Sequence, residues 1–207
     1  VADPAQAVAD LKAGECDLVD PAAGVLPISD LPADAQVFTQ PASWTLLLFG
    51  MDALDDARPS PFASPGLRRA VALCLDRARV AQAAGGVLAE AYIPTTSPYF
   101  NPAAMLPVHN SAEAVPFLQN AGWYDPDNDP ATPLISLGAP GFANQAAFTV
   151  SLLVSPDASQ QAAALAVQQG LAACGIQVVL ETLPASEYLA AGPEGPVFGR
   201  NFDLALF

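Results

Sequence analysis

The aspartates in the stretch DPDNDP (residues 125–130) have a spacing that could surround a metal ion with oxygen atoms. Calcium loops of the form D-x-[DN]-x-[DN]-G use alternating acidic side chains in this way, with glycine at position six and glutamate at position twelve. Here position six is Pro130 and position twelve is Ser136. Asp, Asn and Pro are also strong turn formers. The stretch therefore predicts a solvated turn and no metal site.

Histidine chemistry would have to use His109, because it is the only histidine in the chain. His109 and Glu113 are spaced i and i+4 and could share a metal ion, but two ligands do not make a site. The only serine or cysteine near His109 in sequence is Ser111, and no nucleophile elbow, phosphate loop or zinc-protease motif occurs. We predict no catalytic residue, no cofactor and no enzyme activity. A metal-dependent hydrolase stays as an alternative that bound zinc or calcium would revive.

A candidate anion-binding site is the stretch SPGLRRAVALCLDRARV (residues 64–80), which holds four of the seven cationic residues of the chain. An anion site needs donors that converge on one point. Arg68 and Arg69 fall on one expected helix, Arg77 and Arg79 on the next, and Asp76 lies at their junction. The arginines therefore predict two solvated helices whose cations offset neighbouring carboxylates.

The charge of the chain excludes several classes of partner. The sequence has 207 residues, a formal net charge of −14 and 52% hydrophobic residues. This charge opposes a nucleic-acid backbone or an anionic bilayer, because lysine and arginine supply the affinity for both. No apolar run is long enough to cross a bilayer, and the first ten residues carry neither the basic nor the apolar region of a signal peptide. The composition predicts a soluble globular protein without a nucleic-acid partner.

Cysteine chemistry is limited by spacing. Cys16, Cys74 and Cys174 lie far apart and form no C-x-x-C pair, which leaves zinc and redox motifs unsupported. Each lies in an apolar helix or strand pattern, so we expect buried, inert thiols. A disulfide between two of them stays open.

The elements that position these residues alternate between helix and strand. Asp3 before Pro4 is typical of a helix start, and Asn110 with Glu113 forms a capping-box pattern, although Pro116 predicts a kink or a late start. The expected helices are 5–13, 65–75, 77–84, 110–121, 157–173 and 186–191. The expected strands are 16–19, 37–39, 45–49, 134–137, 148–154, 176–183 and 202–207. This alternation predicts an α/β sheet with helical crossovers.

A family resemblance starts from the arginine-rich stretch. PFASPGLRRAVALCLDR (residues 61–77) resembles the segment P-F-x-D-x-x-V-R-x-A-(L/I)-x-x-(A)-I-D-R of the family 5 extracellular solute-binding proteins, the dipeptide, oligopeptide and nickel binders of ABC importers. LKAGECDLVD, NSAEAVPFLQNAGW, AAALAVQQGLAACGIQVVLETLPASEY and NFDLALF resemble further family segments in family order. Together the similarities cover nearly the whole chain. The matching residues of the first segment are Pro61, Phe62, Arg68, Ala70, Asp76 and Arg77.

The resemblance implies a periplasmic-binding-protein-like fold of type II, in which two α/β lobes are joined by crossing strands and hold a ligand between them. It implies that residues 1–48 are a partial strip of lobe one and residues 49–207 are the second lobe. This lobe would have a mixed, mostly parallel sheet flanked by helices. The hinge crossings would lie near residues 49–52 and 203–207.

The function implied by the resemblance is capture of an extracellular solute and its delivery to the membrane permease of an ABC importer. Peptides lead as the solute, with nickel chelates, oligosaccharides and opines open. The protein would be a monomer, extracellular or periplasmic, and anchored through a lipidated N-terminus outside this sequence. The alternative is the solute-sensing domain of a transcriptional regulator that carries the same module.

The ligand-facing residues that we expect are on the hinge strands and on one loop: Phe49, Met51, Thr95, Tyr99 and Phe207. For each of them, packing inside the lobe is the competing interpretation. Met51 stands where the family commonly has asparagine, so a polar contact of the family would be missing here. The family residues that bind a peptide's amino terminus would lie beyond Phe207.

Overall fold

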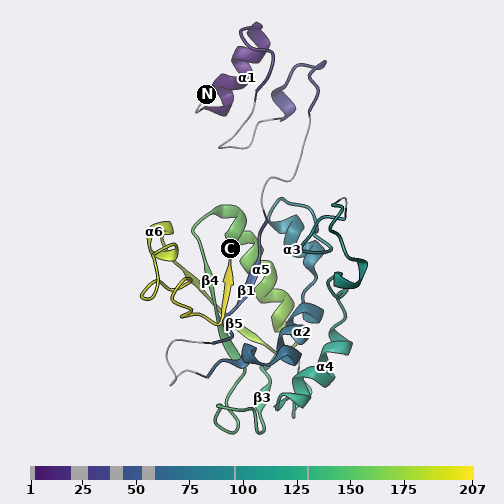
Figure 1. Cartoon of the computed structure of the whole chain (residues 1–207), viewed down its shortest axis with the longest axis vertical. Helices are drawn as coiled ribbons and strands as arrows, with labels where there is room; N and C mark the ends of the chain where they lie inside the picture. The colour runs from purple at the N-terminus through teal and green to yellow at the C-terminus, as the bar shows by residue number, and fades with distance from the viewer. Residues whose placement is uncertain (1–2, 20–27, 38–43, 53–58, 96, 130) are drawn as a thin grey trace. The chain divides into compact units, whose positions relative to one another are not determined.

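The computed structural model describes residues 3–19, 28–37, 44–52, 59–95, 97–129 and 131–207 (Figure 1). Contacts divide the chain into two compact units, Val1–Gln40 and Pro41–Phe207. The assignment of residues 1–48 to lobe one and of 49–207 to the second lobe stays a prediction.

The first unit contains the helix α1 (Pro4–Ala13) and a short 3-10 helix, η1 (Ile28–Asp30). The Asp3 carboxylate accepts a hydrogen bond from Ala5 N at 2.9 Å, and Gly14 ends α1 with a φ of 71°. The prediction of a strand at residues 16–19 is wrong, because these residues form no strand. An isolated strand is not stable, and the described part of this unit has no second strand to pair with it. Most of the strand expected at 37–39 falls outside the described residues.

The second unit is built on a four-stranded sheet with the order β1-β6-β4-β5. β4 is parallel to β5 and to β6, whereas β1 is antiparallel to β6. The helix α5 carries the chain from β4 to β5, as a parallel pair requires. The predicted mixed, mostly parallel sheet is confirmed. Its members are β1 (Leu47–Phe49), β4 (Thr149–Val154), α5 (Ala158–Ala172), β5 (Gln177–Thr182) and β6 (Leu204–Leu206).

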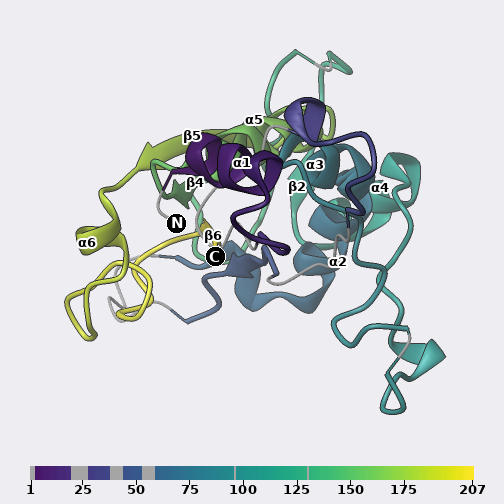
Figure 2. The ribbon, with the colours of Figure 1, turned by 90° about the horizontal axis from the view of Figure 1, so that it is seen from above.

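Alternate residues of the strands divide between two cores, because successive side chains of a strand point to opposite faces. Leu152 and Leu204 belong to the larger core, which includes residues of α2, α4 and α5. Leu153 and Ala205 belong to a smaller core with Tyr188. Figures 1 and 2 show α6 on the other side of the sheet from α2, α3 and α4. These helices are α2 (Pro65–Cys74), α3 (Arg77–Ala83), α4 (Ser111–Asn120) and α6 (Ala185–Tyr188).

The predicted helix starts are reproduced at their caps. Asp76 Oδ1 accepts from Arg79 N at 3.1 Å, and Asn110 Oδ1 accepts from Glu113 N at 3.2 Å. α4 begins at Ser111 and continues through Pro116, so the late start is wrong. The Asn110 cap satisfies an amide of the first turn and holds it in place. Three short elements complete the unit: η2 (Pro61–Ala63), η3 (Pro102–Ala104) and the hairpin of β2 (Trp123–Tyr124) with β3 (Ile135–Ser136).

Cys74 and Cys174 form a disulfide across a sequence separation of 100 residues. The bond joins the end of α2 to the turn between α5 and β5. The expectation of inert thiols is therefore wrong for these two residues, and the open alternative of a disulfide applies. Cys16 is a half-buried free cysteine. Within the described ranges, no helix is long and apolar enough to cross a membrane.

Candidate functional site

The two predicted crossings lie side by side in the sheet. Leu47 pairs with Leu206, and Phe49 pairs with Leu204. Hydrogen bonds extend the ladder at both ends, from Leu46 N to Phe207 O at 2.6 Å and from Gly50 N to Asp203 O at 2.8 Å. The first and last strands of this unit are therefore adjacent and antiparallel.

One end of the crossing is held by a close backbone approach at Gly50. A Cβ at this position would lie 1.9 Å from the carbonyl oxygen of Phe202. The Ser60 hydroxyl donates to the Gly50 carbonyl oxygen. The Asp203 carboxylate accepts from Ser151 N at 2.8 Å and from Ser151 Oγ at 3.2 Å. These contacts tie the crossing to β4 in the middle of the sheet.

The other end of β6 is held by Tyr188, which is buried in the smaller core. Its hydroxyl donates to the carbonyl oxygen of Leu206. We expect Tyr188→Phe to lower the free energy of unfolding by about 1–2 kcal/mol, because a buried carbonyl loses a hydrogen bond while the ring packing is kept. Urea denaturation measures this difference. An unchanged midpoint would show that the hydroxyl contributes nothing.

The pH dependence of stability distinguishes the contribution of the Tyr188 hydroxyl from that of the packing of its ring. Burial raises the pKa of Tyr188 to about 12, whereas an unfolded tyrosine ionises near pH 10. The unfolded chain loses this proton first, so the stability that Tyr188 contributes should fall as the pH rises from about 10 to about 12. The difference between the wild type and Tyr188→Phe should shrink over this interval.

The predicted site residues of the hinge strands do not converge. The half-buried Phe49 packs edge-on against Phe62, with 5.2 Å between ring centroids. Phe207 packs edge-on against Phe198, with 6.2 Å between ring centroids. The strand register puts these two site residues at opposite ends of the β1–β6 pair. Met51, just past β1, is 52% exposed.

Thr95 and Tyr99 lie on a loop that links α3 to α4. The loop as described here comprises residues 87–95 and 97–108, and we call it the apolar loop. Tyr99 is 81% exposed and Thr95 is exposed. Many of the exposed large hydrophobic side chains of the described chain lie on this loop: Val87, Leu88, Tyr92, Ile93, Tyr99, Met105, Leu106 and Val108. The expected residues Thr95 and Tyr99 thus belong to a larger exposed apolar surface that sequence reasoning missed.

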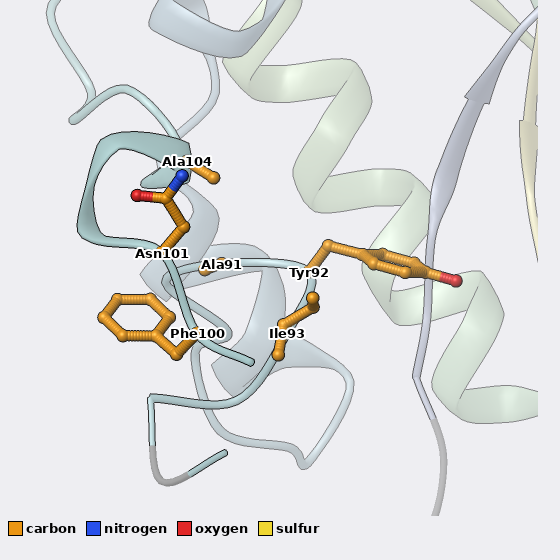
Figure 3. Close-up of a pocket in the computed structure, with 6 residues that line it drawn as sticks. All are labelled: Ala91, Tyr92, Ile93, Phe100, Asn101 and Ala104. Carbon is orange, nitrogen blue, oxygen red and sulfur yellow. The ribbon is translucent and has the colours of Figure 1, made fainter. Parts of the chain in front are cut away.

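The apolar loop also forms a pocket of about 210 Å³ (Figure 3). Asn101 supplies its polar group, and Asn101 Oδ1 accepts a hydrogen bond from Ala103 N at 3.0 Å. Figure 3 shows the Tyr92 ring directed away from Phe100 and Asn101. The volume is below that of pockets that enclose whole small molecules. The lining residues are Ala91, Tyr92, Ile93, Phe100, Asn101 and Ala104, so neither Thr95 nor Tyr99 is among them.

The arginines make separate contacts and do not form one anion site. Arg68 donates to the Phe62 carbonyl oxygen at 2.7 Å, and Arg79 donates to Gln169 Oε1 at 2.8 Å. Arg69 lies 3.4 Å from Glu113. The prediction that the arginines offset carboxylates therefore holds for Arg69, and burial lowers the pKa of Arg77 while the charge of Glu90 raises it. Arg68 binds a main-chain carbonyl group and Arg79 an amide side chain instead.

The described part of the aspartate stretch, residues 125–129, is a hydrogen-bonded turn, as predicted. The Asp127 carboxylate accepts from Asp129 N and from Thr132 Oγ1, both at 3.1 Å. The backbone hydrogen bond from Asp129, followed by side-chain hydrogen bonds, lowers the pKa of Asp127. Among the residues that the structure describes, no three His, Cys, Asp or Glu side chains are grouped to hold a metal ion.

The mixed, mostly parallel sheet flanked by helices has the fold of the type II periplasmic binding proteins. A family model described as "Bacterial extracellular solute-binding proteins, family 5 Middle" matches residues 1–207. The chain belongs to this family. A sequence comparison with curated proteins found no match.

Solved structures show the same fold over all or most of the chain. The periplasmic oligopeptide-binding protein of an oligopeptide ABC transporter from Thermotoga maritima has a TM-score of 0.64 and 18% identity, covering 100% of this chain and 38% of its own. AppA from Bacillus subtilis, solved with a nonapeptide, has a TM-score of 0.62 and 18% identity. The match covers 100% of this chain and 39% of AppA. MelB from Agrobacterium fabrum C58, solved with stachyose, has a TM-score of 0.62 and 19% identity. The match covers 79% of this chain and 25% of MelB. The chain thus spans well under half of each of these proteins.

Proposed function

We propose that this chain is part of a solute-binding component of an ABC importer, with residues 1–48 as a strip of lobe one and residues 49–207 as the second lobe. The full-length protein captures an extracellular or periplasmic solute in a cleft between two lobes and delivers it to a membrane permease. Closure around a solute shifts the population from open to closed conformations. The observation that carries the proposal is the antiparallel pairing of β1 with β6, which brings both chain crossings to one place in a family 5 chain.

The solute-facing surface of this lobe comprises Met51 and the apolar loop with Thr95 and Tyr99. Their exposure supports this assignment, because a binding surface must be free to contact the solute. Phe49 and Phe207 support the crossing through aromatic packing within the lobe. Peptides are the proposed solute, since the similar protein AppA was solved with a bound nonapeptide.

The Cys74–Cys174 disulfide favours an importer component over a cytoplasmic regulator with the same module. Disulfides persist in the periplasm and outside the cell and are rare in the reducing cytosol. The bond therefore supports an extracellular or periplasmic location.

The experiment is mass spectrometry of what copurifies with the full-length protein after gentle isolation and denaturation. We expect a defined mixture of short peptides. The variant Tyr99→Ala should retain less peptide, whereas Leu165→Ala, which removes an exposed side chain of α5 outside the apolar loop, should retain the wild-type amount. A single non-peptide species would replace the peptide assignment and leave solute binding in place.

A further inference from the structure

Arg77 joins both ends of the apolar loop. Its Nη1 donates to the carbonyl oxygen of Ala89 at 2.8 Å, where the loop leaves α3. Its Nη2 donates to the carbonyl oxygens of Leu106 at 3.5 Å and Pro107 at 3.0 Å, where the loop returns toward α4. One side chain thus bridges two segments that are far apart in sequence.

We call the place where these two segments meet, residues 89–90 and 106–107, the neck of the loop. A backbone hydrogen bond also joins them there, from Leu106 N to Glu90 O at 3.0 Å. The loop has little core of its own, because Ala91 is the one fully buried residue among its described members. A segment with few buried apolar contacts has low local stability. The conformation of the loop therefore depends on the contacts at its neck.

The geometry suits arginine in particular. A guanidinium group presents five N–H donors in a rigid planar fork, whereas the lysine ammonium is a compact point charge on a flexible stem. Arg77 is the first residue of α3, and α3 packs against α5. Its backbone is therefore anchored on the body of the lobe while its side chain holds the loop.

We propose that Arg77 is the positioning residue of the apolar loop: it closes the neck and sets the conformation in which the loop meets the solute. The second half of this statement rests on the proposed function, and the first half does not. Arg77 contacts no solute in this account and acts through the carbonyl groups that it binds.

The test compares Arg77→Met and Arg77→Lys with Arg79→Met in the full-length protein. Arg79 lies on the same helix and has the same charge, but it binds Gln169 and is the matched control. Amide hydrogen exchange of Leu106 reports the neck, and exchange in α5 reports the body of the lobe. We expect both Arg77 variants to speed Leu106 exchange by about tenfold or more, since charge-assisted hydrogen bonds are lost. Exchange in α5 should stay unchanged.

Binding is measured on the same variants with a tryptic digest of casein as the probe. We expect the Arg77 variants to retain about tenfold less peptide than the wild type, and Arg79→Met to retain the wild-type amount. Wild-type exchange at Leu106 in both Arg77 variants would overturn the proposal. Faster exchange with unchanged peptide retention would overturn the positioning role and leave the proposed function standing. If the wild type retains no peptide, the peptide assignment fails, and amide exchange alone decides the role of Arg77.

Discussion

Replacing both Cys74 and Cys174 with alanine is expected to lower the free energy of unfolding by about 2–5 kcal/mol. The bond closes a loop of 100 residues in sequence, and a long closed loop restricts the unfolded chain more than a short one does. It also joins α2 to the α5–β5 turn, two parts of the larger core. Without the bond, these elements depend on packing alone.

The measurement is thermal unfolding of the full-length protein with and without a reductant. For a domain of this size, 1 kcal/mol corresponds to about 2–4 °C in Tm, so a fall of roughly 10 °C is expected for the double variant. The reductant should then have no further effect on it. Cys16→Ala is the matched control, because Cys16 is a free cysteine in the other unit and should leave Tm unchanged. Equal Tm values for oxidised and reduced wild type would contradict the prediction.

Gly50→Ala is expected to destabilise the protein by about 3 kcal/mol or more. The added Cβ would lie 1.9 Å from the Phe202 carbonyl oxygen, which is a backbone atom without a rotamer to move away. Moving the segment at Gly50 away from the segment at Phe202 would strain the hydrogen bond from Gly50 N to Asp203 O. It would also strain the contacts of Asp203 with Ser151. The substitution should therefore damage the pairing of β1 with β6 as well as stability.

Urea denaturation and retention of casein peptides report these two effects. Gly66→Ala is the matched control, because the nearest atom to its new Cβ is Ser64 Oγ at 3.6 Å. On a helix this control should be neutral or stabilising by up to about 1 kcal/mol. The steric account would be refuted by a Gly50→Ala protein that unfolds at the wild-type urea concentration.

Local patterns predicted most helices well and strands less reliably. The caps at Asp3, Asp76 and Asn110 mark helix starts that the structure reproduces, because a cap is satisfied by amides two or three residues away. The strand expected at residues 16–19 fails because a strand needs a partner. An apolar run does not show whether a partner lies nearby.

The exposed surface and the pocket could be predicted from the sequence only in part, for a similar reason. Tyr99 and Met51 are exposed on the loop and the crossing where the sequence placed them. The pocket that uses Tyr92 and Asn101 was missed, since it depends on how the apolar loop folds back on itself. Exposure and pocket shape are properties of the folded chain, and residue types alone do not specify them.

The sequence by itself determined where most helices start, the family and, through the family, the class of fold. These follow from residues close together in the chain and from motifs in a fixed order. The tertiary structure decided the pairing of Cys74 with Cys174, the approach of Gly50 to Phe202, and the use of Arg77 to close a loop. Each of these contacts brings together segments that are apart in the chain. Because long-range packing selects them, no local pattern could have predicted which segments meet.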